Sequence, residues 1–220
     1  MRLNNKHTGV LALLISLLFT ACEKHDQVVD YSLKVGNIYI SDGRILPPEA
    51  YDPQQHTAVA VIVATGNSND PFKALGVALD EWQDRAANMT GELDGVSGDI
   101  DDMNGRSNTA AMLAAMDENE KLDCAAAVSV NAYGEGDGRW HLPACGELLR
   151  LASNRHKIDE VMKTVGGKPL STDLYLSSTV DGTDENSKKL FMRNVSLQEG
   201  RVVSSNRTAE KTVRPFILIR

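Results

Sequence analysis

The stretch Gly138–Leu151, GRWHLPACGELLRL, concentrates the residues that decide the fold of this chain. Pro143 suits the first turn of a helix, where a backbone N–H has no partner to lose. Beyond it, apolar side chains recur at the spacing of one helical face: Cys145, Leu148, Leu149 and Ala152. The pattern predicts an extended segment at Trp140–Leu142 that leads into a helix packed on the core, with Trp140 as a core residue.

The same stretch also admits a chemical interpretation. A helix N-terminus lowers the pKa of a thiol and a nearby imidazole can activate it, so His141 and Cys145 form a candidate catalytic dyad. The alternatives are a buried free thiol or a disulfide with Cys124. We expect the Cys124–Cys145 disulfide and no enzymatic activity, because the two cysteines form an even pair in a chain with an export leader. Glu147 is expected to bond a loop backbone or a late arginine such as Arg214.

The N-terminus has the layout of a bacterial export leader. Arg2 and Lys6 precede the apolar run Val10–Phe19, whose length of about ten residues is half of what a membrane span needs. Small residues then lead into Cys22, which resembles the lipidated cysteine of bacterial lipoproteins. We expect a signal peptide over residues 1–21, a lipidated tether over 22–34 and one domain over 35–220. The chain would then be anchored to the outer membrane by lipid, facing the periplasm or the cell surface.

The charge of the chain argues against nucleic acid as a partner. Its 23 basic and 30 acidic residues give a net charge of −7, and a chain of this sign repels phosphate backbones. Acidic residues concentrate between Ser41 and Glu120, whereas the segment from Leu174 to Arg220 is net basic. The basic end could meet an anionic glycan, but a solvated strand surface is the simpler interpretation.

Hydrophobic patterning predicts an α+β domain with antiparallel strands and central helices. Strands are expected early and late in the chain, with the chain ends paired in one sheet. The expected strands are 35–40, 56–64, 75–79, 174–178, 190–195, 200–204 and 212–219. The expected helices are 107–116, 121–133, one that begins near Pro143, and one from Asn154 to Lys163 that ends at Gly166-Gly167.

Two polar loops are the candidate ligand sites, because binding residues favour loops on rigid scaffolds. The first, Gly91–Gly105, carries hard oxygen ligands that suit calcium: Asp99, Asp101, Asp102 and Asn104. The EF-hand spacing fails, so a loop of another calcium-binding kind and a solvated acidic loop both remain open. The second, Ser178–Lys188, carries Asp181 and Asp184. The sequence contains no zinc spacing, nucleophile elbow or phosphate loop, so we expect no cofactor other than this calcium.

Three segments together resemble a known family. Trp140-His-Leu-Pro143 with Gly146-Glu147-Leu148, the run Tyr175-Leu-Ser-Ser-Thr179 and the run Val213-Arg-Pro-Phe216 resemble, in order and spacing, the motifs of the Lcl C-terminal domain family. The early segment 35–43 resembles versions carried by Bacteroides-type surface lipoproteins. The chain departs from the pattern at Leu176, where the family usually has tryptophan, and the acidic segment 91–105 does not align.

The resemblance implies a fold related to the C-type-lectin-like fold and a role in binding or adhesion. Fold kinship does not transfer activity. We therefore expect a cell-envelope lipoprotein whose domain binds a glycan, a matrix component or a partner in a surface assembly. The alternatives are a structural accessory subunit of fimbrial type and, less favoured, a Cys/His thiol enzyme.

Overall fold

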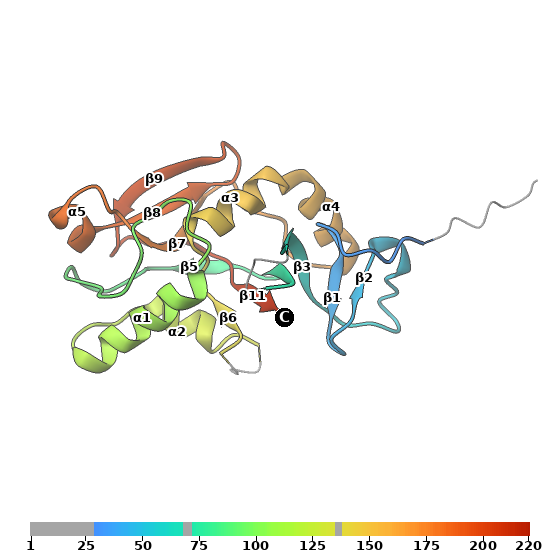
Figure 1. Cartoon of the computed structure of the whole chain (residues 1–220), viewed down its shortest axis with the longest axis horizontal. Helices are drawn as coiled ribbons and strands as arrows, with labels where there is room; N and C mark the ends of the chain where they lie inside the picture. The colour runs from blue at the N-terminus through green and yellow to red at the C-terminus, as the bar shows by residue number, and fades with distance from the viewer. Residues whose placement is uncertain (1–28, 68–71, 135–137) are drawn as a thin grey trace, which may run out of the picture.

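A computed structural model describes residues 29–67, 72–134 and 138–220. The predicted leader and Cys22 lie outside these residues. The described chain forms two sheets with helices around them, elongated from a blue N-terminal end to an orange and red end that carries late strands (Figure 1). In these residues, none of the helices combines the length and the apolar character that crossing a bilayer requires.

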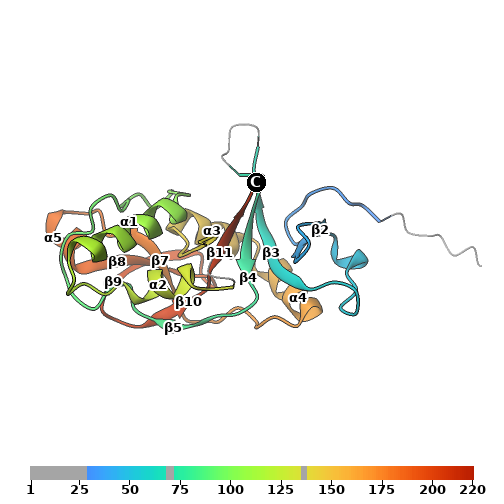
Figure 2. The same ribbon diagram turned by 90° about the horizontal axis from the view of Figure 1, so that it is seen from below.

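The first sheet has six strands and unites the two ends of the described chain, as the sequence predicted. Its neighbouring strands are all antiparallel, in the order β2 (Ile45–Leu46), β1 (Ile38–Ile40), β3 (Ala58–Thr65), β4 (Ala74–Ala78), β11 (Phe216–Ile219) and β6 (Trp140–His141). Figure 2 shows β11, β4 and β3 side by side. The β-branched run in β3 forms the buried central strand that its composition favours.

The second sheet has five strands, in the order β5 (Trp82–Asp84), β10 (Lys211–Val213), β7 (Leu174–Val180), β8 (Phe191–Ser196) and β9 (Arg201–Asn206). Its pairs are antiparallel except β10 with β7, which run parallel. Helix α3 (Cys145–Ser153) contacts β7 and β8, and α1 (Gly105–Glu118) contacts β7 and also α2 (Ala125–Asn131). Figure 1 shows α3 on one side of this sheet and α1 with α2 on the other.

Helix α4 (Arg155–Val165) contacts β3 and ends at Gly166, whose φ of 71° gives the left-handed cap that its position after the helix predicted. The remaining helices are the 3-10 turn η1 (Pro48–Ala50) and α5 (Glu185–Leu190). The coarse prediction of an α+β domain with antiparallel strands and central helices is therefore confirmed.

Three expected elements differ from the observed ones. The predicted strand 212–219 is divided at Arg214-Pro215 into β10 and β11, which belong to different sheets. The predicted helix 121–133 begins only at Ala125, because the backbone of Asp123 exchanges hydrogen bonds with Asn88. The expected loop 178–188 contains the end of β7 and the start of α5.

Candidate functional site

The opening stretch builds a buried polar network at the start of α3. Glu147 accepts a hydrogen bond from the Ala144 backbone N–H at 2.9 Å, which fixes the first turn of the helix. His141 Nε2 lies 3.2 Å from Glu147 Oε2, and both side chains have about 1% of their surface exposed. Glu147 therefore pairs with His141, and the expected partner Arg214 lies elsewhere.

Cys145 does not contact His141 through a hydrogen bond. Its Sγ lies 3.4 Å from Ser177 Oγ, and its backbone N–H donates to Thr179 Oγ1 at 3.0 Å. Burial raises the pKa of the Cys145 thiol, opposed by the hydrogen bonds from Ser177 and Thr179. Cys145 is thus a buried thiol among hydroxyl groups, without the lowered pKa and the hydrogen bond to His141 that a catalytic dyad would use; the dyad stays a prediction without support from this geometry.

The predicted Cys124–Cys145 disulfide is wrong for this structure: both are buried free thiols. Cys124 packs with Leu176 and Met192 against α1 and α2, whereas Cys145 packs with Tyr175 and Val195. The two cysteines thus belong to opposite faces of the five-stranded sheet. Burial raises the pKa of Cys124 to about 11.

The three motif segments are far apart in the sequence but contact one another in the fold. Ser178 N–H donates to Pro143 O at 2.8 Å, and Thr212 pairs with Tyr175. Phe216 pairs with His141 across β11 and β6. These contacts tie α3, β7 and the divided C-terminal strand into one unit that joins the two sheets.

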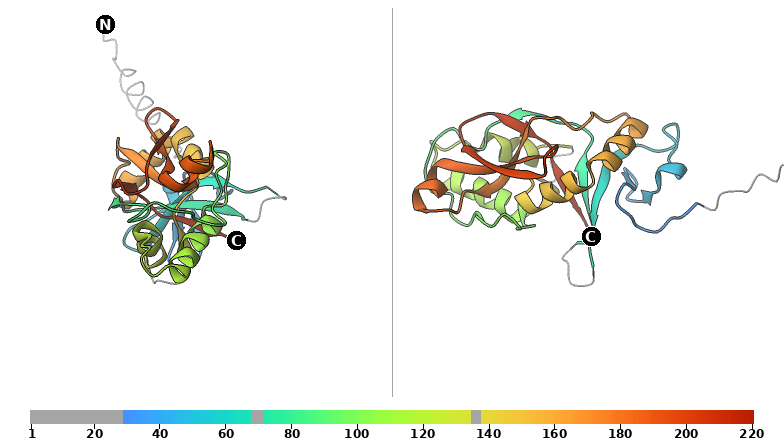
Figure 3. Two further views of the ribbon diagram at one scale, coloured as in Figure 1. Left: turned by 90° about the vertical axis from the view of Figure 1, so that its left-hand side faces the viewer. Right: turned by 90° about the horizontal axis from the view of Figure 1, so that it is seen from above.

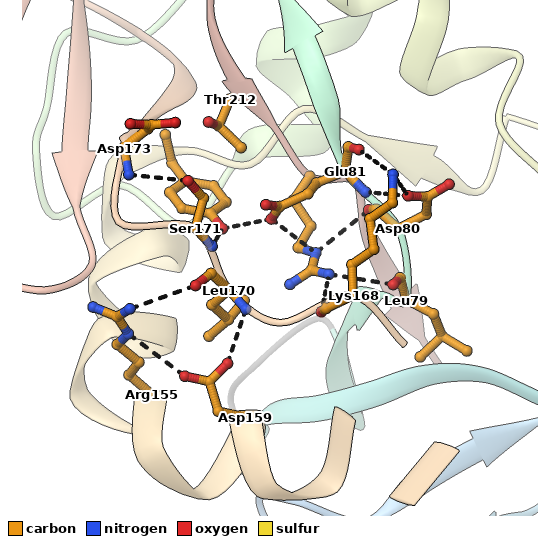
Figure 4. A network of polar contacts seen from close by, with 12 residues as sticks. Leu79, Asp80, Glu81, Arg155, Asp159, Lys168, Leu170, Ser171, Asp173 and Thr212 are labelled. Carbon is orange, nitrogen blue, oxygen red and sulfur yellow. Dashed lines mark hydrogen bonds and ion pairs between the residues drawn. The ribbon is translucent and has the colours of Figure 1, made fainter. Parts of the chain in front are cut away.

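Arg214 lies in a second polar network, and Figure 4 labels its partners Leu79, Glu81 and Lys168. Its guanidinium is completely buried, donates to the carbonyls of Leu79 and Lys168, and lies 3.4 Å from Glu81 Oε2. The Tyr175 hydroxyl donates to the same carboxylate oxygen at 2.5 Å. Burial and the Glu81 charge raise the pKa of Tyr175. The turn of Arg214 into this site explains why the strand divides there.

The first candidate loop uses its acidic side chains on its own backbone. Asp99 Oδ1 accepts from Asp101 N–H at 2.9 Å, and Asp102 Oδ1 accepts from Asn104 N–H at 2.7 Å. Asp102 is buried and its other oxygen accepts from Asn108 at 3.3 Å. Across the described ranges, no group of three His, Cys, Asp or Glu side chains is placed to hold a metal ion. The side chains of Asp99 and Asp102 therefore shape the loop through the backbone N–H groups of Asp101 and Asn104, and the calcium site stays a prediction.

The second candidate loop is also internally bonded. Asp181 is buried, pairs with Arg193 at 2.7 Å, and accepts from Thr183 and Ser204. Burial raises its pKa, but those two hydrogen bonds and the Arg193 charge outweigh burial and lower the pKa below its usual value. Asp184 accepts from the N–H groups of residues 186 and 187 and caps α5. Both carboxylates therefore hold the local conformation, and their role in ligand binding stays a prediction.

The two candidate loops nevertheless converge. Val180 N–H donates to Ser97 O at 3.0 Å, and the backbones of Gly98 and Gly182 pass so closely that a Cβ on Gly98 would lie 2.9 Å from Gly182 Cα. Together the loops line a cavity of about 350 Å³. Its lining includes Glu92, Asp94, Val180, Glu185, Lys188 and Lys189. The Glu92–Lys189 ion pair bridges the loops at 2.8 Å.

A separate cleft is aromatic. Tyr39, Tyr133 and Trp140 are among the residues that line a volume of about 400 Å³ beside β1 and β6. Tyr133 meets Trp140 edge-on at 4.9 Å between ring centroids and stacks on Trp82 at 5.7 Å. Trp140 is only 4% exposed, so it supports the cleft as the core residue that the sequence predicted.

Sequence reasoning missed several residues that organise these sites. Asn108 joins both loops, since Oδ1 accepts from Ser97 N–H and its amide approaches Asp102 and Ser178. Gly146 lets the acidic loop approach α3, because a Cβ there would lie 2.6 Å from the carbonyls of Asp101 and Asp102. A helical glycine beside a capping glutamate was the available signal for Gly146; Asn108-Thr109 fitted the resembled family, but no local pattern marked Asn108 as a link between the loops.

No protein-family model matches the chain, and no curated protein matches it. The fold is similar to the crystal structure of a fimbrial protein from Bacteroides ovatus ATCC 8483, with a TM-score of 0.66 and 17% sequence identity. The match covers 85% of this chain and 49% of that one. The chain thus spans about half the length of the fimbrial protein, and the likeness establishes a shared fold.

Proposed function

We propose that this chain is a structural subunit of a fimbrial-type assembly on the cell surface, held to the membrane by a lipid on Cys22. The observation that carries the proposal is the fold likeness to a fimbrial protein over 85% of the chain. The three motif segments resemble the Lcl C-terminal domain family. As part of the same proposal, we infer that this chain is related to that family of surface proteins.

The chemistry of the site supports a structural role. His141, Glu147 and Cys145 have almost no exposed surface, and each bonds to backbone or to a neighbouring side chain. Asp102 and Asp181 hold loop conformations in the same way. Groups that are buried and bonded in this manner make a rigid, single conformation, which suits a building block that must present the same surface in every copy.

Co-purification tests the proposal. Filaments sheared from the producing cells should contain the chain in a constant ratio to their other components, and a Cys22→Ser variant should be lost from the cell-bound fraction. A His141→Ala variant that folds should be retained in the filaments, because no chemistry is required of it. Absence of the chain from every surface filament would refute the proposal.

A binding domain for a glycan or matrix component is the second candidate, favoured by the aromatic cleft of Tyr39, Tyr133 and Trp140. Tyr39 and Tyr133 are half-buried, and aromatic rings that line a cleft with polar groups nearby suit small-molecule recognition. A glycan and matrix-protein array, probed with calcium and again with chelator, tests it. A signal lost in a Tyr39→Ala, Tyr133→Ala double variant would support the cleft, and a signal lost on chelation would implicate the Asp99–Asn104 loop.

A further inference from the structure

The four edges of the two sheets are protected very unequally. Native proteins limit unwanted pairing by keeping edge strands very short or by placing charges and prolines on them. Strands β2 and β6 have two residues each, and β5 has three. In contrast β9 has six residues, Arg201–Asn206, and pairs with β8 alone among the described strands. Its register with β8 continues through six residue pairs without a bulge.

The backbone of β9 leaves a regular set of groups unpaired. Arg207 N–H donates to Leu190 O, directly opposite, so this is a hydrogen-bonded pair of the antiparallel ladder. Such pairs alternate along a strand, so residues 201, 203 and 205 bond to β8. The N–H groups of Val202, Ser204 and Asn206 are therefore directed to the open edge.

Most side chains of the edge do not oppose pairing, and its one charged residue, Arg201 at the first position, is ion-paired with Glu199 at 2.9 Å. The stretch Val202–Asn206, VVSSN, contains no charge and no proline. Among the described elements, Figure 1 shows none beyond β9. Figure 3 (right) shows the orange and red late strands at the opposite end from the blue segment that begins at Val29.

We propose that β9 is a self-pairing edge, at which two copies of this chain join antiparallel about a two-fold axis at Ser204. The outward groups are symmetric about Ser204. Ser204 would pair with Ser204 of the second copy, and Val202 with Asn206. Every outward N–H in the strand then finds a carbonyl, and the two five-stranded sheets become one continuous sheet. The proposal concerns contact between two identical chains and does not depend on membership of a fimbria.

A cysteine at the axis tests this geometry. In the full chain carrying Cys22→Ser, the two remaining native thiols are buried. Ser204→Cys would meet its own counterpart at a Cα separation of about 5.5 Å, which a disulfide bridges. Asn206→Cys is the matched control on the same strand, because its counterpart would lie about 13 Å away along the strand. Under mild oxidation, we expect roughly tenfold less covalent dimer from Asn206→Cys than from Ser204→Cys.

A second pair of variants separates pairing from folding. Val202→Pro removes an outward N–H that β8 does not use, whereas Val202→Ala removes similar packing and keeps the N–H. Added to Ser204→Cys, the proline should reduce cross-linking several-fold and the alanine should not, with both folded by circular dichroism. Equal cross-linking at positions 204 and 206, or none at 204 in folded protein, would overturn the proposal. The latter is also the outcome if a different chain covers β9. Neither result bears on co-purification with filaments, so the two proposals fail separately.

Discussion

Glu81 Oε2 lies 3.4 Å from Arg214 Nε, and this carboxylate is the counter-ion of a guanidinium with no exposed surface. The pair joins the segment between β4 and β5 to the point where the C-terminal strand passes from one sheet to the other. It also receives the Tyr175 hydroxyl from β7. Three segments distant in sequence are thus held by one carboxylate.

Replacing Glu81 by glutamine should destabilise the fold by about 3 kcal/mol, because a neutral amide leaves the buried Arg214 charge uncompensated. Urea unfolding followed by tryptophan fluorescence measures the change. Glu160→Gln is the matched control: its ion pair with Lys163 is mostly exposed, so its loss should change the free energy of unfolding far less than Glu81→Gln does. Equal losses of unfolding free energy in the two variants would show that the Glu81–Arg214 pair stabilises the fold no more than an exposed ion pair does.

Gly146→Ala should destabilise the chain by about 1–3 kcal/mol, the usual cost of overpacking. The added methyl would meet the carbonyls of Asp101 and Asp102 at 2.6 Å, so the acidic loop must move away from α3. Hydrogen exchange should rise at residues 99–104, and thermal unfolding should report the loss. Ser107→Ala, on the exposed side of α1, is the control and should alter neither; unchanged exchange in Gly146→Ala would contradict the packing.

Both internal cysteines should resist modification until the protein unfolds, because Cys124 and Cys145 are buried and their thiol pKa values are raised. A thiol reagent at neutral pH should label neither in the folded Cys22→Ser chain and both in denaturant. The mass of the non-reduced chain provides an independent check. A mass two hydrogens lower would restore the disulfide that the sequence suggested.

Asp181 should contribute stability that depends on pH in one direction. Its pKa is lowered in the folded chain, so its contribution is complete above the ordinary aspartate pKa of about 3.9 and is lost as the pH falls through the folded value. The difference in unfolding free energy between the wild type and Asp181→Asn should be constant above about pH 5 and shrink below about pH 4. If the difference in unfolding free energy grew as the pH fell, it would contradict a lowered pKa of Asp181 in the folded chain. Asp117→Asn, on α1, is the control.

The sequence predicted the elements whose signals are local. The β-branched run of β3 and Gly166 after α4 each mark their structure through nearby residues, and both were found close to the expected positions. The division of the last strand was not predictable in this way. It depends on Arg214 reaching carbonyls at residues 79 and 168, which are distant in the chain.

The same difference between local signals and long-range contacts holds for the candidate site. Composition identified the two polar loops, which do converge, but residue types alone could not show that their carboxylates bond their own backbone. A count of two cysteines likewise suggested a bridge. Only the arrangement of the five-stranded sheet, with Cys124 on one face and Cys145 on the other, shows why the thiols stay apart.

Strand β11 lies between β4 and β6, yet it follows both in the chain. In the described chain every other strand of both sheets therefore precedes β11, and without β11 one side of β4 is open. A chain cut before Phe216 would keep that open edge, and an open edge is a template for aggregation. The order of the strands thus makes the arrival of β11, and not the early hydrophobic core, the step that closes the six-stranded sheet.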